Sequence, residues 1–161
     1  YTFMKTGIGF DIHRFEKGRR FMLGGIEIPF AKGLLGHSDG DVLLHSISDA
    51  ILGAMGKQDI GYYFPDMDKN LKGLASVEII KKVLSLMEAE RYTIKNMDVI
   101  LICEEPKLLP FFEAMRKNLS EVMNIDAGNI GLKAKTFEHI GAIGRGSACA
   151  CFVSVLLGKK Y

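Results

Sequence analysis

The chain has 161 residues, of which 48% are hydrophobic and 25% charged, and its net charge at pH 7 is +2. The length predicts one domain over residues 1–161, with enough apolar residues to build a core. Because both signs of charge are interspersed, we expect no nucleic-acid partner and no membrane partner. The longest apolar stretches, such as residues 148–157, have about half the length that a membrane-spanning helix needs.

The cysteines indicate a reducing compartment. Cys103, Cys149 and Cys151 form no CxxC pair, and three cysteines cannot all pair within one chain. We therefore expect reduced thiols, buried as small apolar residues, in a cytoplasmic-type compartment. The first residues also lack the basic, apolar and small-residue regions of a signal peptide.

The first quarter of the chain predicts a strand and a hairpin. Residues 5–11 have the pattern of a short strand. Residues 21–29 form two apolar runs joined by Gly24 and Gly25, a pair that tolerates positive φ. A loop is expected at residues 32–36.

Two helices follow, separated by a long loop. Ser38 or Asp39 is predicted to cap the first helix, which runs to about Met55 with apolar residues at helical spacing. The Gly- and Pro-marked residues 56–73 are long enough for a functional loop. Ser76 starts the second amphipathic helix.

The second half of the chain predicts three strands and a helix. Residues 97–103 and 130–136 have the patterns of strands, and a helix that opens near Pro110 and runs to about Met123 lies between them. Residues 148–157 form the last strand, which is apolar on both faces and therefore belongs to a sheet covered on both faces. Helices can cover one face, and another copy of the chain is a natural cover for the other.

Candidate metal ligands occur in two places. Asp11 and His13 are two positions apart, so on an extended segment both point to the same side. His45 lies about 150° from the centre of the apolar stripe of its helix and does not belong to the core face. Two histidines and a carboxylate make an open-sided Zn²⁺ site, and nearby aspartates such as Asp41 and Asp49 can orient the imidazoles. Spacing alone, however, is more often explained by solvated side chains.

Candidate phosphate-binding residues follow the strand at 130–136. Gly141, Gly144 and Gly146 flank Arg145, so backbone N–H groups and a guanidinium can grip phosphate. Glu138 is a hard oxygen ligand that suits Mg²⁺ shared with a diphosphate. The alternative is a surface turn with a solvated arginine. Carboxylates at 59–68 can hold sugar hydroxyls or end helices and turns, and residues 104–110 can be a simple strand-to-helix joint.

In chain order these segments resemble the motif series of the 2-C-methyl-D-erythritol 2,4-cyclodiphosphate synthases. The likeness covers about residues 5–159. The motifs that carry it are Gly9-Phe10-Asp11-Ile12-His13, the signature Gly33-Leu34-Leu35-Gly36-His37-Ser38-Asp39-Gly40-Asp41-Val42-Leu43-Leu44-His45, Asp59-Ile60-Gly61 with Phe64-Pro65-Asp66, Pro106-Lys107-Leu108-Leu109-Pro110, and Lys133-Ala134-Lys135-Thr136 with Gly144-Arg145-Gly146.

The resemblance implies a lyase of the non-mevalonate isoprenoid route. The 2-phosphate of 4-diphosphocytidyl-2-C-methyl-D-erythritol 2-phosphate would attack the β-phosphorus, release CMP and leave 2-C-methyl-D-erythritol 2,4-cyclodiphosphate. The metal ligands implied for Zn²⁺ are Asp11, His13 and His45. Glu138 would help to hold Mg²⁺ or Mn²⁺ on the diphosphate, and His37 and Thr136 would align and stabilise the transition state.

The same resemblance implies the substrate contacts, the fold and the assembly. Residues implied to contact the cytidine diphosphate substrate are Asp11, Ile12, His13, His37, Ser38, Asp59, Ile60, Gly61, Phe64, Pro65, Asp66, Met67, Asp68, Cys103, Glu104, Glu105, Pro106, Lys107, Leu108, Leu109, Lys135, Thr136, Phe137, Glu138, Ala142 and Arg145. The expected fold is α+β, a mixed sheet with helices on one face. The expected assembly is a homotrimer whose sheets face each other, with sites between subunits, in a bacterial cytoplasm or a plastid stroma.

Two other functions are compatible with these ligands. In a zinc-dependent phosphohydrolase, metal-bound water would attack in place of a tethered phosphate. A trimeric binding protein with a structural metal is the non-enzymatic alternative. Three ligands without a thiolate argue against it, because structural zinc sites usually have four protein ligands.

Overall fold

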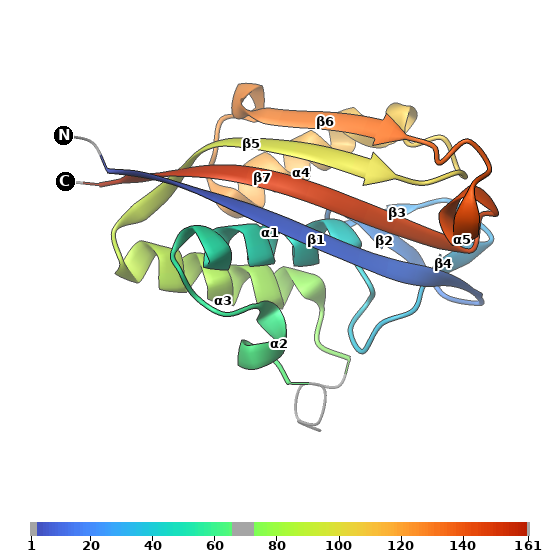
Figure 1. The fold of residues 1–161 in the computed structure, drawn as a ribbon, viewed down its shortest axis with the longest axis horizontal. Helices are drawn as coiled ribbons and strands as arrows, with labels where there is room; N and C mark the ends of the chain where they lie inside the picture. The colour runs from blue at the N-terminus through green and yellow to red at the C-terminus, as the bar shows by residue number, and fades with distance from the viewer. Residues whose placement is uncertain (1–2, 66–72, 161) are drawn as a thin grey trace.

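The computed structural model describes residues 3–65 and 73–160 (Figure 1). Its strands and helices, in chain order, are β1 (Met4–Lys17), β2 (Phe21–Leu23), β3 (Ile26–Ile28), β4 (Lys32–Leu34), α1 (Val42–Ala54), α2 (Ile60–Tyr63), α3 (Ser76–Ala89), β5 (Tyr92–Ile102), the 3₁₀ turn η2 (Leu109–Phe111), α4 (Phe112–Met123), the 3₁₀ turn η3 (Ala127–Asn129), β6 (Ile130–Lys135), α5 (Gly141–Gly144) and β7 (Ala148–Lys159).

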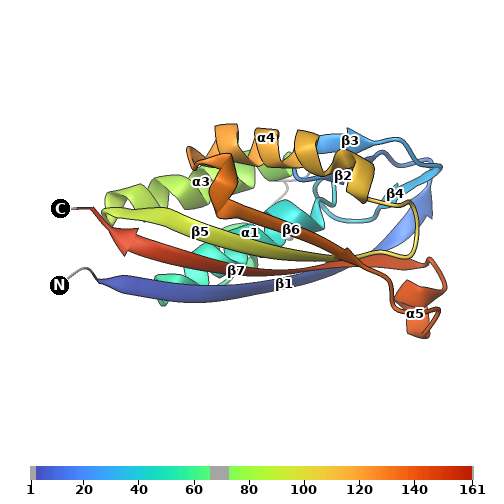
Figure 2. The same ribbon diagram turned by 90° about the horizontal axis from the view of Figure 1, so that it is seen from above.

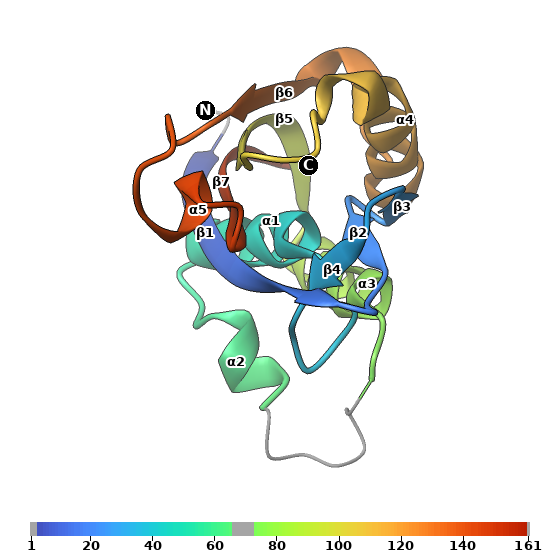
Figure 3. The ribbon, with the colours of Figure 1, turned by 90° about the vertical axis from the view of Figure 1, so that its right-hand side faces the viewer.

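Five strands form one mixed sheet in the order β4-β1-β7-β5-β6, in which β5 and β6 run parallel and the other neighbours antiparallel. The long helices α1, α3 and α4 lie on one side of this sheet (Figure 2), and the sheet curves around α1 (Figure 3). The α+β class with helices on one face is therefore confirmed. Within the described ranges, no helix is long and apolar enough to cross a membrane.

Alternation along β1 separates a helix-facing side from an open side. Gly7 and Gly9 face α1 and are buried, whereas Ile8 and Phe10, which alternate with them, are exposed. A Cβ on Gly9 would lie 1.8 Å from the carbonyl oxygen of Ser46, so the strand and the helix touch backbone to backbone. This close approach sets α1 directly over the strand that carries Asp11 and His13.

The first helix begins later than predicted. Asp41, not Ser38 or Asp39, is its N-cap, and the Asp41 carboxylate accepts the N–H groups of Leu43 and Leu44. It also accepts the N–H groups of Gly24 and Gly25, which have positive φ in the β2–β3 hairpin, as predicted. One buried carboxylate thus joins the hairpin to the start of α1. Because Asp41 serves as acceptor for the N–H groups of the hairpin as well as for those of the helix, the helix begins after Asp41.

Other elements extend or interrupt the predicted ones. The strand predicted at residues 5–11 continues to Lys17, and the loop predicted at 32–36 contains β4, which pairs with the end of β1. The predicted strand at 97–103 begins at Tyr92. The short helices α2 and α5 were not expected, because four residues show no periodicity.

Candidate functional site

Three ligand-type side chains meet between β1 and the first turns of α1. Oδ2 of Asp11 lies 2.9 Å from Nε2 of His13 and 3.0 Å from Nδ1 of His45, and the two nitrogens are 3.4 Å apart. The three ligand atoms lie close enough to share one metal ion. The two predicted halves of the metal site, more than thirty positions apart in sequence, are therefore brought together by the packing of α1 on β1.

The hydrogen bonds of His13 fix which of its nitrogens faces the cluster as a ligand. Nδ1 lies 2.5 Å from the carbonyl oxygen of Leu35, which can only accept, so Nδ1 carries a hydrogen. Nε2 then presents a lone pair toward Asp11 unless the ring is protonated. A carboxylate and two imidazole nitrogens that converge in this way can hold a cation between them, and this chemistry fits a metal ion.

In the absence of a metal, protons on the histidines supply part of the positive charge beside Asp11. Burial raises the pKa of Asp11, but hydrogen bonds from His13 and His45 outweigh burial and hold it well below its usual range. Burial likewise lowers the pKa of His13, and the hydrogen bond to Asp11 outweighs it and raises the pKa. The cluster thus keeps its carboxylate charged and attracts positive charge.

The groups that orient His45 differ from those expected. Nε2 of His45 lies 2.9 Å from the Ser76 hydroxyl and 3.1 Å from the Ser38 hydroxyl. Asp41 is used as the helix cap, and Asp49 accepts the N–H of Ile60 at 2.8 Å. The prediction that these two aspartates orient the imidazoles is therefore wrong. His45 is 6% exposed, so the alternative of a solvated histidine is wrong as well.

The predicted phosphate-binding residues form a second group at the end of β6. The Thr136 hydroxyl donates to Oε1 of Glu138 at 2.6 Å, and both side chains are exposed. Glu138 and His139 have φ of 48° and 63°. This left-handed turn, rather than strand alternation, folds Glu138 back onto Thr136. Glu104 supports the turn by accepting the N–H of Phe137 at 3.1 Å.

The remaining predicted residues are spread over several elements. Asp59 caps α2, and Ile60 is anchored to Asp49, one helical turn beyond His45. The Cys103 N–H donates to the Lys135 carbonyl, so the segment 103–109 borders the second group.

The exposed Ala142 and Arg145 lie in α5 and directly after it, beside the start of β7. Ile12 points to the open side of the sheet, away from its neighbours. Asp66, Met67 and Asp68 lie outside the described residues.

His37 lies on the exposed loop before α1, and its carbonyl accepts the N–H of Gly73 at 3.1 Å. This contact brings the residues before α3 next to the loop that carries Ser38. The contact of Ser76 with His45 is one that sequence analysis missed. Ser76 was recognised only as a helix start, and nothing in the sequence indicates that its hydroxyl meets a histidine 31 positions away.

Within one chain the two groups stand apart. Ile12 on β1 pairs with Ala150 on β7, Ala150 with Ile102 on β5, and Ile102 with Lys135 on β6. Three strand spacings correspond to about 14 Å across the sheet. The cluster of Asp11, His13 and His45, called the metal group below, and the Thr136–Glu138 group therefore do not share one compact pocket within the described part of a single chain.

A model of the YgbB family matches residues 4–158, which is nearly the whole chain. The chain belongs to the YgbB family. Its curated relatives include the 2-C-methyl-D-erythritol 2,4-cyclodiphosphate synthases of Fusobacterium nucleatum and Treponema denticola, which are 45% and 48% identical to it. In both cases the alignment covers 98% of this chain and 98% of the relative.

Solved structures agree with the YgbB assignment. A CDP complex of IspF from Plasmodium falciparum superposes with a TM-score of 0.87 at 36% identity, over 100% of this chain and 99% of that one. The bifunctional IspDF of Campylobacter jejuni gives a TM-score of 0.95 at 39% identity, over 99% of this chain but 43% of that longer chain. The family resemblance inferred from the motifs is confirmed.

Proposed function

We propose that this chain is a cyclodiphosphate synthase. It converts 4-diphosphocytidyl-2-C-methyl-D-erythritol 2-phosphate to 2-C-methyl-D-erythritol 2,4-cyclodiphosphate and releases CMP, in the non-mevalonate isoprenoid route. The observation that carries the proposal is the Asp11–His13–His45 group, preformed in a chain whose relatives bear this enzyme's name over their whole length. A solved relative also binds CDP.

The reaction is an attack by a phosphate already tethered to its target, so the protein must chiefly position the diphosphate and neutralise charge. Asp11, His13 and His45 would hold Zn²⁺, which when bound supplies a Lewis acid for a phosphate oxygen. Thr136 donates a hydrogen bond to the charge that develops during transfer, and His37 aligns the reacting groups. Glu138 would hold Mg²⁺ or Mn²⁺ shared with the diphosphate.

The active form in this proposal is a homotrimer. Ile8, Phe10, Ile12 and Phe152 stand on the open face of the sheet and are 64%, 51%, 45% and 41% exposed in the single chain. The Phe10 and Phe152 rings lie 6.1 Å apart across β1 and β7 and form one apolar patch. Such a patch is typical of a protein interface, and two further copies of the same face would cover it.

A trimer also completes the site. The metal group lies about 14 Å across the sheet from the Thr136–Glu138 group, a distance that follows from three strand spacings. In the proposal, the metal group of one subunit faces the Thr136–Glu138 group and the segment 103–109 of its neighbour, and the substrate lies between them. Asp59, Ile60 and Gly61, beside the metal group, contact the sugar. Reduced, buried cysteines fit the predicted cytoplasmic or stromal compartment.

The test is incubation of the zinc-loaded protein with the cytidyl substrate and Mg²⁺, followed by phosphorus NMR. The proposal predicts equal amounts of CMP and a cyclic diphosphate. A zinc phosphohydrolase would instead yield a linear phosphate and inorganic phosphate or CMP. Either that outcome or the absence of turnover would reject the proposed function.

A further inference from the structure

A chain of hydrogen bonds runs from the metal group to a carboxylate that is not a metal ligand. Nε2 of His45, the nitrogen turned away from Asp11, lies 2.9 Å from the Ser76 hydroxyl. The Ser76 hydroxyl in turn donates to Oδ1 of Asp39. Ser76 is fully buried at the first position of α3, so this hydroxyl is shielded from bulk water.

The direction of the hydrogens in this chain follows from its last member. An ionised Asp39 can only accept, so the Ser76 hydrogen points to Asp39 and the Ser76 oxygen is left as an acceptor. That oxygen then accepts the hydrogen of His45 Nε2, to which the Ser38 hydroxyl also lies close, at 3.1 Å. When a metal ion takes the place of the proton that Nδ1 shares with Asp11, Nδ1 of His45 turns a lone pair toward the ion, and this is the tautomer that a metal ligand needs.

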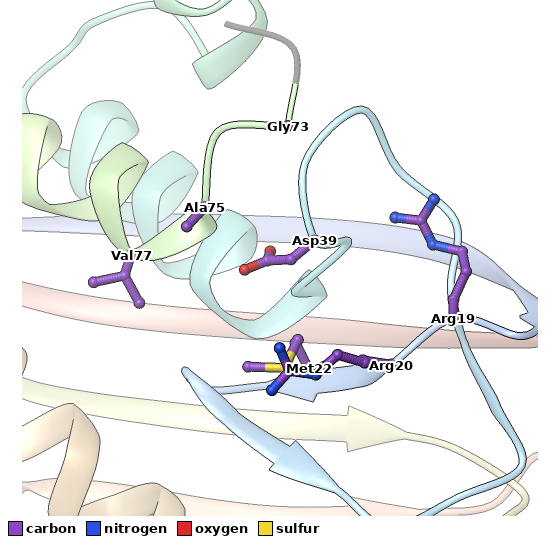
Figure 4. Close-up of a pocket in the computed structure, with 7 residues that line it drawn as sticks. All are labelled: Arg19, Arg20, Met22, Asp39, Gly73, Ala75 and Val77. Carbon is purple, nitrogen blue, oxygen red and sulfur yellow. The ribbon is translucent and has the colours of Figure 1, made fainter.

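Asp39 is itself held firmly in place. Its carboxylate accepts the N–H groups of Asp41 and Ser76, each at 3.3 Å. Nη2 of Arg19 donates to the Ser38 carbonyl at 3.0 Å and steadies the loop that carries Asp39. Asp39 also lines a pocket of about 490 Å³, together with Arg19 and the residues before and at the start of α3, as Figure 4 shows.

We propose that Ser76 and Asp39 are positioning residues for the metal: they fix the tautomer and the ring orientation of His45, and thereby the affinity of the site. This inference rests on the proposed metal binding by Asp11, His13 and His45. Partners that orient a metal-bound histidine in this way typically raise metal affinity about 10- to 100-fold. The other role open to Asp39 is purely structural, because it accepts the first N–H of α3 and so caps that helix.

The experiment compares Ser76→Ala with Ser85→Ala, a matched loss of one hydroxyl on the same helix. The Ser85 hydroxyl is exposed and donates to the Lys82 carbonyl, far along α3 from the metal group. Zinc affinity is measured by competition with a chelator, and thermal unfolding is measured on the metal-free proteins. We expect Ser76→Ala to bind zinc about 10- to 100-fold more weakly and Ser85→Ala to bind it normally.

Asp39→Asn provides a second variant that preserves side-chain size. If Asp39 acts through Ser76, the loss of affinity in the double variant will be smaller than the product of the two single losses. The hydrogen on Nε2 of His45 is followed by ¹H–¹⁵N NMR of the zinc-loaded protein. We expect this hydrogen to exchange slowly with water in the unmodified protein and rapidly in both single variants.

The outcomes separate this inference from the proposed function. If the unmodified protein fails to bind zinc, the proposed metal site is wrong and the inference falls with it. If the unmodified protein binds zinc and His45→Ala does not, but Ser76→Ala and Asp39→Asn bind it as the unmodified protein does, the inference alone is overturned. Lower thermal stability of the variants with unchanged zinc affinity and unchanged exchange of the His45 Nε2 hydrogen also overturns it, because that result is expected of a purely structural helix cap.

Discussion

The two histidines of the metal group are oriented by different kinds of partner. A backbone carbonyl, that of Leu35, holds His13, whereas side chains hold His45. A carbonyl cannot be removed by substitution, so the orientation of His13 is built into the pairing of the loop with β1, where the Leu35 N–H donates to the Arg14 carbonyl. The orientation of His45 depends on the side chain of a residue on another helix.

Removal of either imidazole should empty the metal site. We expect about one Zn²⁺ per unmodified chain, and His13→Ala and His45→Ala should each lose most of it, because two remaining ligands hold zinc weakly. Elemental analysis of the purified proteins measures this directly. A His45→Ala protein with full zinc content would mean that these residues do not form the site.

A substitution at Thr136 should distinguish a role in catalysis from a role in substrate binding. Its hydroxyl donates to Glu138 in the free chain, and in the proposed function it would turn to a phosphate oxygen when Glu138 binds Mg²⁺. Thr136→Ala should lower kcat by ~10²–10³ while CDP affinity and zinc content stay near normal. Steady-state kinetics and CDP titration test this. Full turnover at saturation with weakened CDP binding would show instead that Thr136 stabilises the bound substrate and the transition state equally.

Glu138→Gln should act through the second metal. The amide oxygen lacks the charge of the carboxylate and binds Mg²⁺ more weakly, so the Mg²⁺ concentration for half-maximal activity should rise while zinc content is unchanged. The measurement is a Mg²⁺ titration of CMP release. An unchanged Mg²⁺ requirement would remove Glu138 from that role.

At the scale of elements, the contact between β1 and α1 creates the metal group. Gly9 is two positions before Asp11, and its missing side chain lets the helix that carries His45 touch the strand. Gly53 lies near the other end of the same helix, where a Cβ would meet the Ile8 carbonyl oxygen at an ordinary 3.8 Å. These two glycines form a matched pair for a test of this contact.

Gly9→Ala should destabilise the fold by about 3 kcal/mol or more, because the new methyl group can only be accommodated if α1 moves away from β1. It should also lower zinc affinity, since His45 moves with the helix. Gly53→Ala should raise stability by up to about 1 kcal/mol, because alanine favours helix. Chemical denaturation measures both effects, and a Gly9→Ala protein as stable as the unmodified one would contradict this account of the packing.

The sequence predicts elements well where apolar periodicity is long, as in α3 and α4. It places the start of α1 wrongly because the choice among Ser38, Asp39 and Asp41 depends on the hairpin at Gly24 and Gly25, which is distant in sequence. The grouping of Asp11, His13 and His45 could be predicted because Asp11 and His13 share a strand and because the motifs resemble a known family. The contact of Ser76 with His45 could not be predicted, since no local sequence pattern indicates a contact between the start of α3 and α1.

At the scale of the whole molecule, the open face of the sheet should control assembly. We expect the unmodified protein to sediment as a homotrimer at micromolar concentration. Phe152→Asp would bury a charge in the interface and should dissociate the trimer. Ser85→Asp adds the same charge on an exposed helix face and should leave the trimer intact. A well-folded unmodified monomer in sedimentation analysis would contradict the trimer.

In the proposed trimer, each active site takes its metal group from one subunit and Thr136 from the next. Trimers that contain both His45→Ala and Thr136→Ala subunits, co-expressed with two affinity tags and captured on both in turn, test this sharing. In a cyclic trimer, either mixed composition places one intact metal group against one intact Thr136. The account predicts about one third of the unmodified rate of CMP release from these mixed trimers, far above either variant alone. Activity no higher than that of the separate variants would show that both groups serve one site within a single subunit.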